Sequence, residues 1–193
     1  MPHRLSAHEL VELVFDEGSW RSWDNPPQRG GESESYAAQL AAAAEKSGVD
    51  ESVVTGEALM RGRRVAVVIG EFAFLAGSIG RAAADRLVEA VERATAEGLP
   101  LVAGPVSGGT RMQEGTPAFV QMVRISQAVA THKGEGLPYL VYLRHPTTGG
   151  VMASWGSLGH VTAAEPGALV GFLGPRVYEA LYGRSFPEGV QTA

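Results

Sequence analysis

The sequence predicts an α/β protein in which most strands pair in parallel. Short apolar segments of strand type alternate with amphipathic segments of helix type, and glycine-rich turns separate them. Such alternation is typical of strands that are joined through helices and therefore run in the same direction. The composition, with 45% hydrophobic and 19% charged residues, is that of an ordinary globular protein. The length of 193 residues suits one domain, with room for an appendage.

The first 50 residues are predicted to form a helical extension. Ser6 can cap a first helix, because Glu9 three residues later completes a capping box, and Gly18 ends that helix. Residues 20–31 are polar, contain prolines and show no hydrophobic period, which predicts a loop. An alanine-rich helix is expected from Tyr36 to Lys46.

From residue 51 to residue 193 the chain is predicted to form the main domain. It begins with two strands joined by a short turn around Gly62, and a strongly amphipathic helix follows. The expected strands are Val53–Met60, Arg63–Gly70, Leu101–Val106, Tyr139–Leu143, Val161–Ala164 and Ala168–Phe172. The expected helices are Arg81–Glu97, Pro117–Thr131, Met152–Leu158 and Pro175–Tyr182, and a proline at the first position opens the last of them.

The bulk composition argues against several classes of function. The absence of cysteine excludes disulfides, a thiolate zinc site and a cysteine nucleophile. A net charge of -5 without a basic run argues against nucleic-acid binding. No apolar run approaches the ~20 residues of a membrane span, and acidic residues interrupt the N-terminus where a signal peptide would need an apolar stretch. The expected location is the cytoplasm.

Two glycine-rich turns are the strongest candidates for a functional site. They are Ser107–Arg111 and Pro146–Val151, and each follows an apolar strand and precedes a helix. Paired glycines remove the Cβ atoms that would block a ligand, and they let backbone N–H groups point outward at a helix N-terminus. This arrangement stabilises negative charge on an oxygen, either of a phosphate or of a developing oxyanion. The alternative for either pair is a tight turn without function.

Other motifs narrow the chemistry. Neither a phosphate-binding loop nor a G-x-G-x-x-G fingerprint is present, and no nucleophile elbow or metal-ligand spacing occurs. The five histidines are scattered and are interpreted as surface or structural residues, although His145 beside the second turn is kept open. Glu114 is either a base or, at a helix start, a cap or a hydrogen-bond partner that holds the fold. No metal site is predicted.

Five segments resemble signatures of the carboxyltransferase β subunit of bacterial acetyl-CoA carboxylase. Gly108–Gly115, G-G-T-R-M-Q-E-G, resembles S-G-G-A-R-M-Q-E-G, and Pro146–Val151 matches the family's P-T-T-G-G-V. Phe72–Gly80 looks like F-x-F-M-G-G-S-M-G, and residues 164–177 look like A-E-P-x-A-L-I-G-F-A-G-P-R-V. Val54–Glu57 matches as well, so the resemblance runs in order from about Val53 to the C-terminus.

The resemblance implies a crotonase-like ββα superhelix that binds an acyl-CoA. It also implies transfer of a carboxyl group from carboxybiotin, carried on a carrier protein, to the acyl α-carbon. With acetyl-CoA the product is malonyl-CoA, the precursor of fatty acid biosynthesis. Released biotin is thought to help deprotonate the acyl group in this family, which agrees with the absence of an acid–base pair in the motifs.

The resemblance also implies roles for particular residues. The catalytic backbone groups would be those of Gly149 and Gly150 on the biotin side and of Gly108 and Gly109 on the acyl-CoA side. The residues expected to contact or shape the acyl-CoA site are Ser107, Gly108, Gly109, Arg111, Gly77 and Ser78.

Two departures from the family pattern bear on partners. The four-cysteine zinc ribbon that many β subunits carry is absent, so no zinc is expected. The family continues beyond the point that corresponds to Ala193, so the chain is expected to be truncated or split, and to need a carboxyltransferase α half or a missing C-terminal half. A biotin carboxyl carrier and a biotin carboxylase are the further expected partners. Apolar residues near Leu169, Leu173, Val177 and Leu181 are expected to face a partner, which predicts homo-oligomers without one.

Two other functions remain open at this point. One is an acyl-CoA lyase of the malonate-decarboxylase kind, which would use similar glycine turns. The other is an assembly subunit that keeps the fold without activity. The preferred acyl chain is not predicted.

Overall fold

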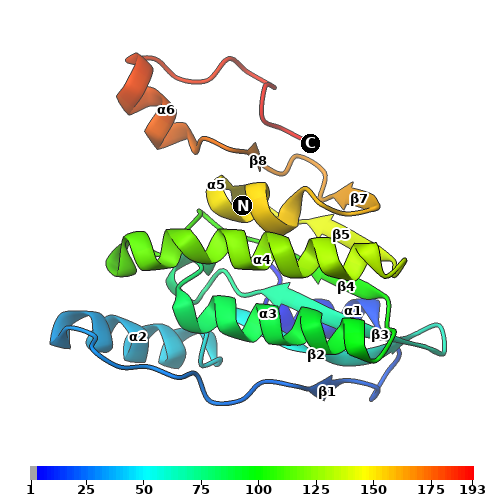
Figure 1. Ribbon diagram of the computed structural model, residues 1–193. Helices are drawn as coiled ribbons and strands as arrows, with labels where there is room; N and C mark the ends of the chain where they lie inside the picture. The colour runs from blue at the N-terminus through cyan, green and yellow to red at the C-terminus, as the bar shows by residue number, and fades with distance from the viewer. Residues whose placement is uncertain (1–3) are drawn as a thin grey trace.

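A six-stranded sheet forms the centre of the molecule (Figure 1). The computed structural model describes residues 4–193, apart from the side chain of Arg176. The strands of the sheet, in spatial order, are β1 (Arg21–Ser22), β2 (Val53–Met60), β3 (Arg63–Gly70), β4 (Leu101–Gly104), β5 (Tyr139–Leu143) and β7 (Val161–Ala164). β1, β2 and β3 pair antiparallel, and β3, β4, β5 and β7 pair in parallel. The predicted α/β class is confirmed.

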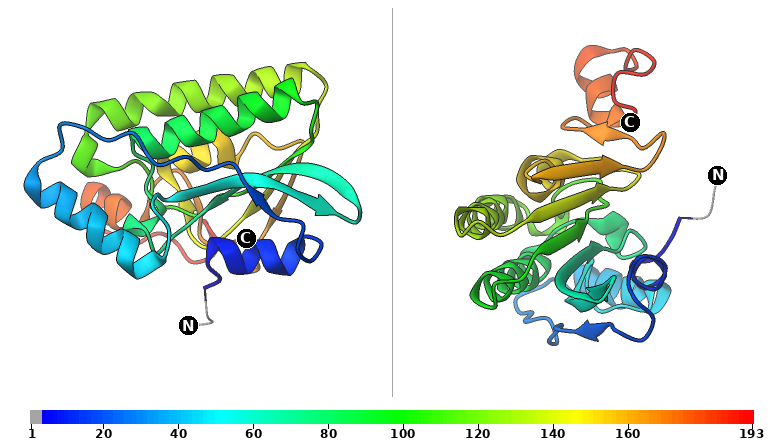
Figure 2. Two further views of the ribbon diagram at one scale, coloured as in Figure 1. Left: turned by 90° about the horizontal axis from the view of Figure 1, so that it is seen from below. Right: turned by 90° about the vertical axis from the view of Figure 1, so that its right-hand side faces the viewer.

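Helices cover both faces of this sheet (Figure 2). α3 (Arg81–Ala96) and α4 (Thr116–Gly134) lie side by side on one face, and α1 (Ala7–Val14) lies on the other. β3 is continuously apolar from Val65 to Ile69, because alternate residues there pack toward opposite faces: Ala66 and Val68 with α3, and Val67 with α1. A strand that is buried on both faces needs apolar residues at every position.

The remaining elements surround the ends of the parallel strands. α2 (Glu34–Ser47) packs through Tyr36, Leu40 and Ala43 on Phe74, just beyond β3. A second, two-stranded parallel sheet, β6 (Thr147–Thr148) with β8 (Val170–Gly171), lies above the main sheet with α5 (Gly149–Val151) and α6 (Pro175–Tyr182) (Figure 1). Three short helical turns complete the chain: η1 (Leu75–Gly77), η2 (Met112–Glu114) and the π-helix η3 (Met152–Gly156).

Most predicted elements are present, and the differences have local causes. β1 lies inside the predicted loop, because two paired residues are too few to produce an alternating pattern. β4 ends at Gly104 because Pro105 has no N–H for the ladder. The helix expected at Met152–Leu158 begins at Gly149 and continues as a π-helix. The strand expected at Ala168–Phe172 is reduced to Val170–Gly171.

The N-terminal 50 residues are integrated with the rest of the chain. Leu10 and Val11 of α1 are buried against the sheet, and β1 extends its edge. The division of the chain at residue 50 stays a prediction. Within residues 4–193, no helix has both the length and the apolar character that a membrane crossing requires.

His132 predicts a pH dependence of stability. Its ring is buried between α3 and α4, where Nδ1 lies 2.9 Å from Thr95 Oγ1, and burial lowers its pKa from the ordinary 6.5. As the pH falls below about 6.5, the unfolded chain takes up a proton that the folded chain resists. The free energy of unfolding should therefore fall as the pH drops from 6.5 through the lowered folded pKa.

This dependence can be measured by denaturant unfolding between pH 7.5 and pH 5. His132→Gln should flatten the slope across that window, whereas His8→Gln, at an exposed position, should keep it. An identical slope in wild type and His132→Gln would contradict the prediction.

Candidate active site

Three chain segments meet at the carboxyl ends of β3, β4 and β5. They are the turn Leu75–Ser78, the first glycine turn Ser107–Arg111 and the second glycine turn Pro146–Val151. The N–H of Gly108 donates to the carbonyl of Ala76 at 3.2 Å, and the N–H of Thr148 donates to the carbonyl of Ser107 at 3.1 Å. The structure therefore brings together the segments that the sequence singled out, and we call them the glycine cradle.

Glycine is required in the cradle where the chain segments touch. A Cβ atom on Gly77, whose φ is 67°, would lie 2.1 Å from the carbonyl oxygen of Val106. A Cβ atom on Gly149, whose φ is 61°, would lie 3.3 Å from the Cα atom of Gly109. Only glycine adopts this left-handed backbone without strain and leaves room for the neighbouring turn.

The backbone N–H groups of the four predicted glycines differ in their partners. Gly108 donates to Ala76, Gly109 donates to the Ser107 hydroxyl at 2.8 Å, and Gly149 donates to the carbonyl of Phe172 at 3.0 Å. Gly150 lies in the first turn of α5. The N–H groups of a first helical turn have no acceptor within the helix. The N–H of Gly150 is therefore the one of these four that is free to bind a ligand oxygen.

The side chain of Arg111 points into the protein. It is 1% exposed, and its Nη2 and Nη1 atoms lie 2.5 and 3.0 Å from the two carboxylate oxygens of Glu51, which is fully buried. Nη2 also donates to the carbonyl of Ser78 at 2.6 Å. Burial alone would lower the pKa of Arg111, but the hydrogen bonds and the charge of Glu51 outweigh it and raise that pKa. Arg111 can thus affect a ligand only through the turns that it holds.

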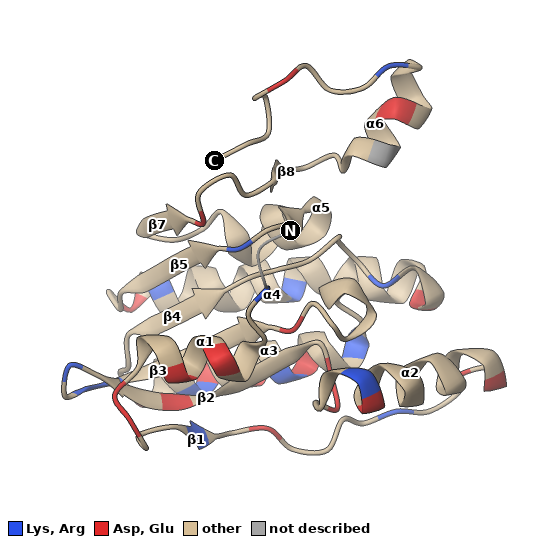
Figure 3. Cartoon of the chain, turned by 180° about the vertical axis from the view of Figure 1, so that it is seen from behind, with Lys and Arg blue, Asp and Glu red and all other residues tan. Residues whose placement is uncertain are grey.

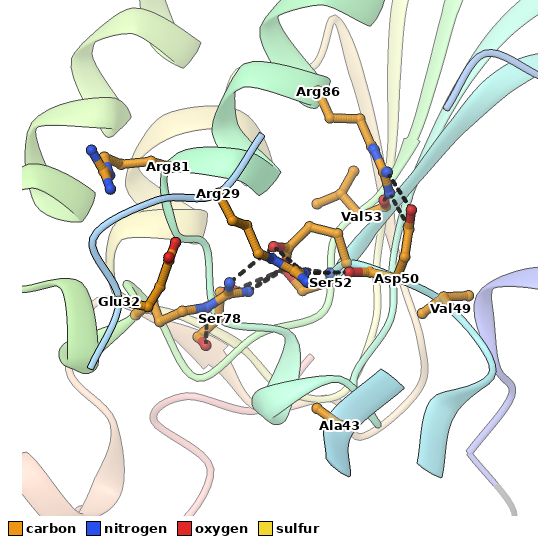
Figure 4. A network of polar contacts seen from close by, with 12 residues as sticks. Arg29, Glu32, Ala43, Val49, Asp50, Ser52, Val53, Ser78, Arg81 and Arg86 are labelled. Atoms are coloured by element: carbon orange, nitrogen blue, oxygen red, sulfur yellow. Dashed lines mark hydrogen bonds and ion pairs between the residues drawn. The ribbon is translucent and has the colours of Figure 1, made fainter. Parts of the chain in front are cut away.

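Polar contacts continue from this pair along the base of the cradle (Figure 4). The hydroxyl of Ser52 donates to the carbonyl of Ser78 at 2.8 Å. Arg29 approaches Glu51 at 3.5 Å, and Arg86 forms an ion pair with Asp50 at 2.8 Å. Nothing in the local sequence around Glu51 or Ser52 marks them as partners of the first glycine turn.

Glu114 holds the fold. One carboxylate oxygen accepts from the Tyr36 hydroxyl at 2.6 Å, and the other accepts from the N–H of Arg81 at 2.7 Å, at the start of α3. Burial and this hydrogen bond raise the pKa of Tyr36 to about 12, so its hydroxyl stays protonated. Of the two roles considered for Glu114, these contacts support the structural one.

His145 fixes the start of the second glycine turn through two hydrogen bonds. Its Nδ1 atom accepts from the N–H of Leu169 at 3.0 Å, and its own N–H donates to Glu165 at 2.8 Å. Both contacts tie the chain before Pro146 to the segment that leads into β8. With its Nδ1 atom used in this way, His145 is assigned a structural role.

A groove lies on the other side of the turn Leu75–Ser78. Its volume is about 740 Å³, and Arg4 and Lys46 supply its positive charges. The guanidinium of Arg4 stacks over the Phe72 ring at 3.8 Å. Leu75 and Ala76 line the groove, so one turn separates it from the cradle.

Ala76 carries backbone strain that a substitution should relieve. Its φ of 56° and ψ of 31° lie in the left-handed region, which costs a residue with a Cβ atom about 1–2 kcal/mol. Ala76→Gly should therefore stabilise the fold by about 0.5–1 kcal/mol after the entropy cost of glycine. Ala73→Gly, where φ is not positive, should not stabilise it. Denaturant unfolding of both variants checks the difference, and a destabilised Ala76→Gly would contradict it.

Comparisons with known proteins give the family. The carboxyl transferase domain model matches residues 3–191. The probable biotin-dependent acyl-coenzyme A carboxylase beta3 subunit of Mycobacterium bovis is 65% identical over 98% of this chain and 38% of that protein. The acetyl-coenzyme A carboxylase carboxyl transferase subunit beta of Prochlorococcus marinus is 40% identical over 99% of this chain and 67% of that protein.

Solved structures agree on the fold. A transcarboxylase 12S structure with hydrolysed methylmalonyl-coenzyme A bound has a TM-score of 0.81 at 24% identity, over 95% of this chain and 34% of that chain. The Pseudomonas malonate decarboxylase MdcD–MdcE heterodimer gives a TM-score of 0.73 at 22% identity, over 94% of this chain and 71% of that chain.

The fold and the glycine cradle define a crotonase-like α/β protein. The chain belongs to the carboxyl transferase domain family, as the resemblance in its signature segments predicted. It spans 38% of the length of its mycobacterial relatives.

Proposed function

We propose that this chain is the acyl-CoA-binding part of a biotin-dependent acyl-CoA carboxyltransferase. The observation that carries the proposal is the meeting of two glycine turns, with a free N–H group of Gly150 at the start of α5. The family and the names of the relatives support the same activity. Acetyl-CoA, giving malonyl-CoA for fatty acid biosynthesis, is the substrate that we propose first, because the P. marinus relative bears the name of that enzyme.

The residues of the cradle fit the oxygen atoms that gain negative charge in such a reaction. Carboxybiotin, when bound, would supply the carboxyl group to the acyl α-carbon, and the bonding electrons would leave negative charge on its ureido oxygen. We propose that Gly150 donates its N–H to that oxygen and that Gly149 shapes the turn that presents this N–H; the position of Gly150 in the first turn of α5 supports the proposal. A preorganised donor of this kind stabilises a developing charge because it need not reorient during the reaction.

The first glycine turn is proposed to form the acyl-CoA side. Gly108 and Gly109 have open space where side chains would stand, which leaves the surface of the turn accessible to a flat thioester. Ser107 fixes this turn, because its hydroxyl accepts from the N–H of Gly109 and donates to the Gly109 carbonyl. Gly77 and Ser78 form the neighbouring side of the acyl-CoA site. Arg111 supports them from inside the protein, because its guanidinium donates to the carbonyl of Ser78.

The groove beside the cradle is proposed to hold the nucleotide end of coenzyme A. Arg4 and Lys46 supply cations for its phosphates. Two carboxylates also line the groove, and both accept from backbone N–H groups: Glu9 from Ser6, and Glu71 from Ala7 and Ala73. A single turn separates phosphates in the groove from a thioester in the cradle.

The experiment that tests this function is reconstitution with a carboxyltransferase α half, a biotin carboxyl carrier and a biotin carboxylase. The expected result is bicarbonate- and biotin-dependent formation of malonyl-CoA from acetyl-CoA. Biotin-independent release of carbon dioxide from a malonyl thioester would instead support a lyase, which the likeness to malonate decarboxylase favours as the second candidate. Assembly of the complex with equal activity in the presence of Gly150→Pro would support a non-catalytic assembly subunit.

We also propose that a cytoplasmic partner covers the surface around α6. In Figure 3 the ribbon there is mostly tan, with red on α6 and charges of both signs in the loop that follows it. Val177 and Leu181 of α6 are 51% and 65% exposed, Phe172 is 63% exposed, and Leu169 and Leu173 are half-buried. Apolar exposure of this kind marks an interaction surface.

Without its partner, the chain should therefore self-associate. Light scattering at increasing protein concentration should show a rising mass, and Leu181→Glu should lower it. A monodisperse monomer at high concentration would contradict this prediction.

A further inference from the structure

A buried charge pair lies directly behind the first glycine turn. Glu51 is fully buried and Arg111 is 1% exposed, and the two groups meet through two hydrogen bonds of 2.5 and 3.0 Å. Two charges removed from water are costly unless their geometry and remaining hydrogen bonds are good. Any movement that separates the two groups would leave a buried charge without its partner. The pair therefore restricts movement of the backbone at Glu51 and Arg111.

Arg111 connects the two turns that form one half of the cradle. Its guanidinium donates to the carbonyl of Ser78, and its backbone N–H donates to the carbonyl of Ile79 at 3.0 Å. The N–H of Ile79 donates in turn to the carbonyl of Gly109 at 3.2 Å. The turn Leu75–Ser78 and the first glycine turn are thus fixed to each other through one residue.

Helix α2 completes this support from the N-terminal part of the chain. The Tyr36 hydroxyl donates to Glu114 at 2.6 Å and accepts from Nη1 of Arg111 at 3.4 Å. Tyr36 is buried beneath the turn through its contact with Phe74. Residues that lie 75 and 60 positions before Arg111 therefore contact the same guanidinium.

We propose that Glu51 and Tyr36 are positioning residues for the acyl-CoA cradle. They orient Arg111, and Arg111 sets the spacing between the turn Leu75–Ser78 and the first glycine turn. Neither residue contacts the ligand. The link to acyl-CoA rests on the proposed function, whereas the mechanical link between the two turns does not.

The test compares Tyr36→Phe with a matched variant elsewhere. Tyr139→Phe also removes a buried hydroxyl, one that donates to the carbonyl of Trp155 at 2.5 Å, in a part of β5 that does not contact Arg111. Amide hydrogen exchange measures how often the hydrogen bonds between the turns open, at the amides of Gly108, Ile79 and Arg111. Calorimetry measures the affinity for acetyl-CoA. Glu51→Gln serves as the stronger second variant where it folds.

Tyr36→Phe should speed exchange at these three amides about tenfold relative to the helix amides of α3. It should weaken acetyl-CoA binding by a similar factor. Losing a hydrogen bond to a charged group has an effect of about that order. Tyr139→Phe should change all amides evenly and leave the affinity unchanged. Equal exchange at the three amides in both variants would overturn the positioning role. If wild type binds no acetyl-CoA while the exchange result holds, the proposed function fails and the link between the turns stands.

Discussion

Replacing Glu51 by glutamine should destabilise the protein by about 3–5 kcal/mol, the cost of leaving a buried charge without its partner. Arg111 is 1% exposed, and Glu51 supplies its two shortest contacts to a carboxylate. The next carboxylate, Glu114, is 3.7 Å away and is already bonded to Tyr36 and Arg81. Water cannot solvate the guanidinium where it lies.

Denaturant unfolding at pH 7 measures this loss. Glu45→Gln, on the exposed side of α2, removes the same charge and should change the free energy of unfolding by less than about 0.5 kcal/mol. A loss below about 1 kcal/mol in Glu51→Gln would show that the pair does not hold the turn.

Gly150→Pro should lower the turnover of the reconstituted enzyme by about 10²–10³-fold. Proline has no N–H, so the substitution removes the one donor among the four predicted glycines that has no acceptor in the protein. Position 150 is in the first helical turn, where proline is tolerated. The helix itself should therefore persist.

Gly150→Ala is the matched control for the side chain. It keeps the N–H and adds a Cβ atom that would lie 3.0 Å from the Thr110 methyl group and 3.1 Å from Met122. Both neighbours are side chains that can shift, so the loss of turnover should stay within about tenfold, the equivalent of 1.4 kcal/mol. Equal losses in both variants would point to crowding and would contradict a donor role for Gly150.

The sequence alone predicts the regular part of the fold well because its signals are local. β2 and β3 have the predicted bounds, since an apolar run, a Gly62 turn and a second apolar run fix a hairpin. The capping box at Ser6 is also present, because it depends on two residues that are three positions apart. The small β6–β8 sheet was not predicted, because its two-residue strands pair across the chain.

The site was predictable in outline and not in its hydrogen bonds. The glycine pairs mark both turns in the sequence, but the acceptor for the N–H of Gly149 is the carbonyl of Phe172, which directly follows β8. The partner of Arg111 is likewise distant in sequence, at Glu51. The resemblance predicted Arg111 on the acyl-CoA side, and the structure shows that its side chain is buried against Glu51 and the carbonyl of Ser78.

Calorimetric titration of this chain with acetyl-CoA, propionyl-CoA and free coenzyme A, repeated on Gly109→Val, decides whether the first glycine turn binds an acyl-CoA. Position 109 has a φ of 127° and open space around it, so valine would both strain the turn and fill the cradle. We expect thioester binding in the micromolar to millimolar range, the usual range of substrate affinity, and its loss in Gly109→Val. Absence of binding to any thioester, even with the complementary half added, or unchanged binding in Gly109→Val, would contradict it.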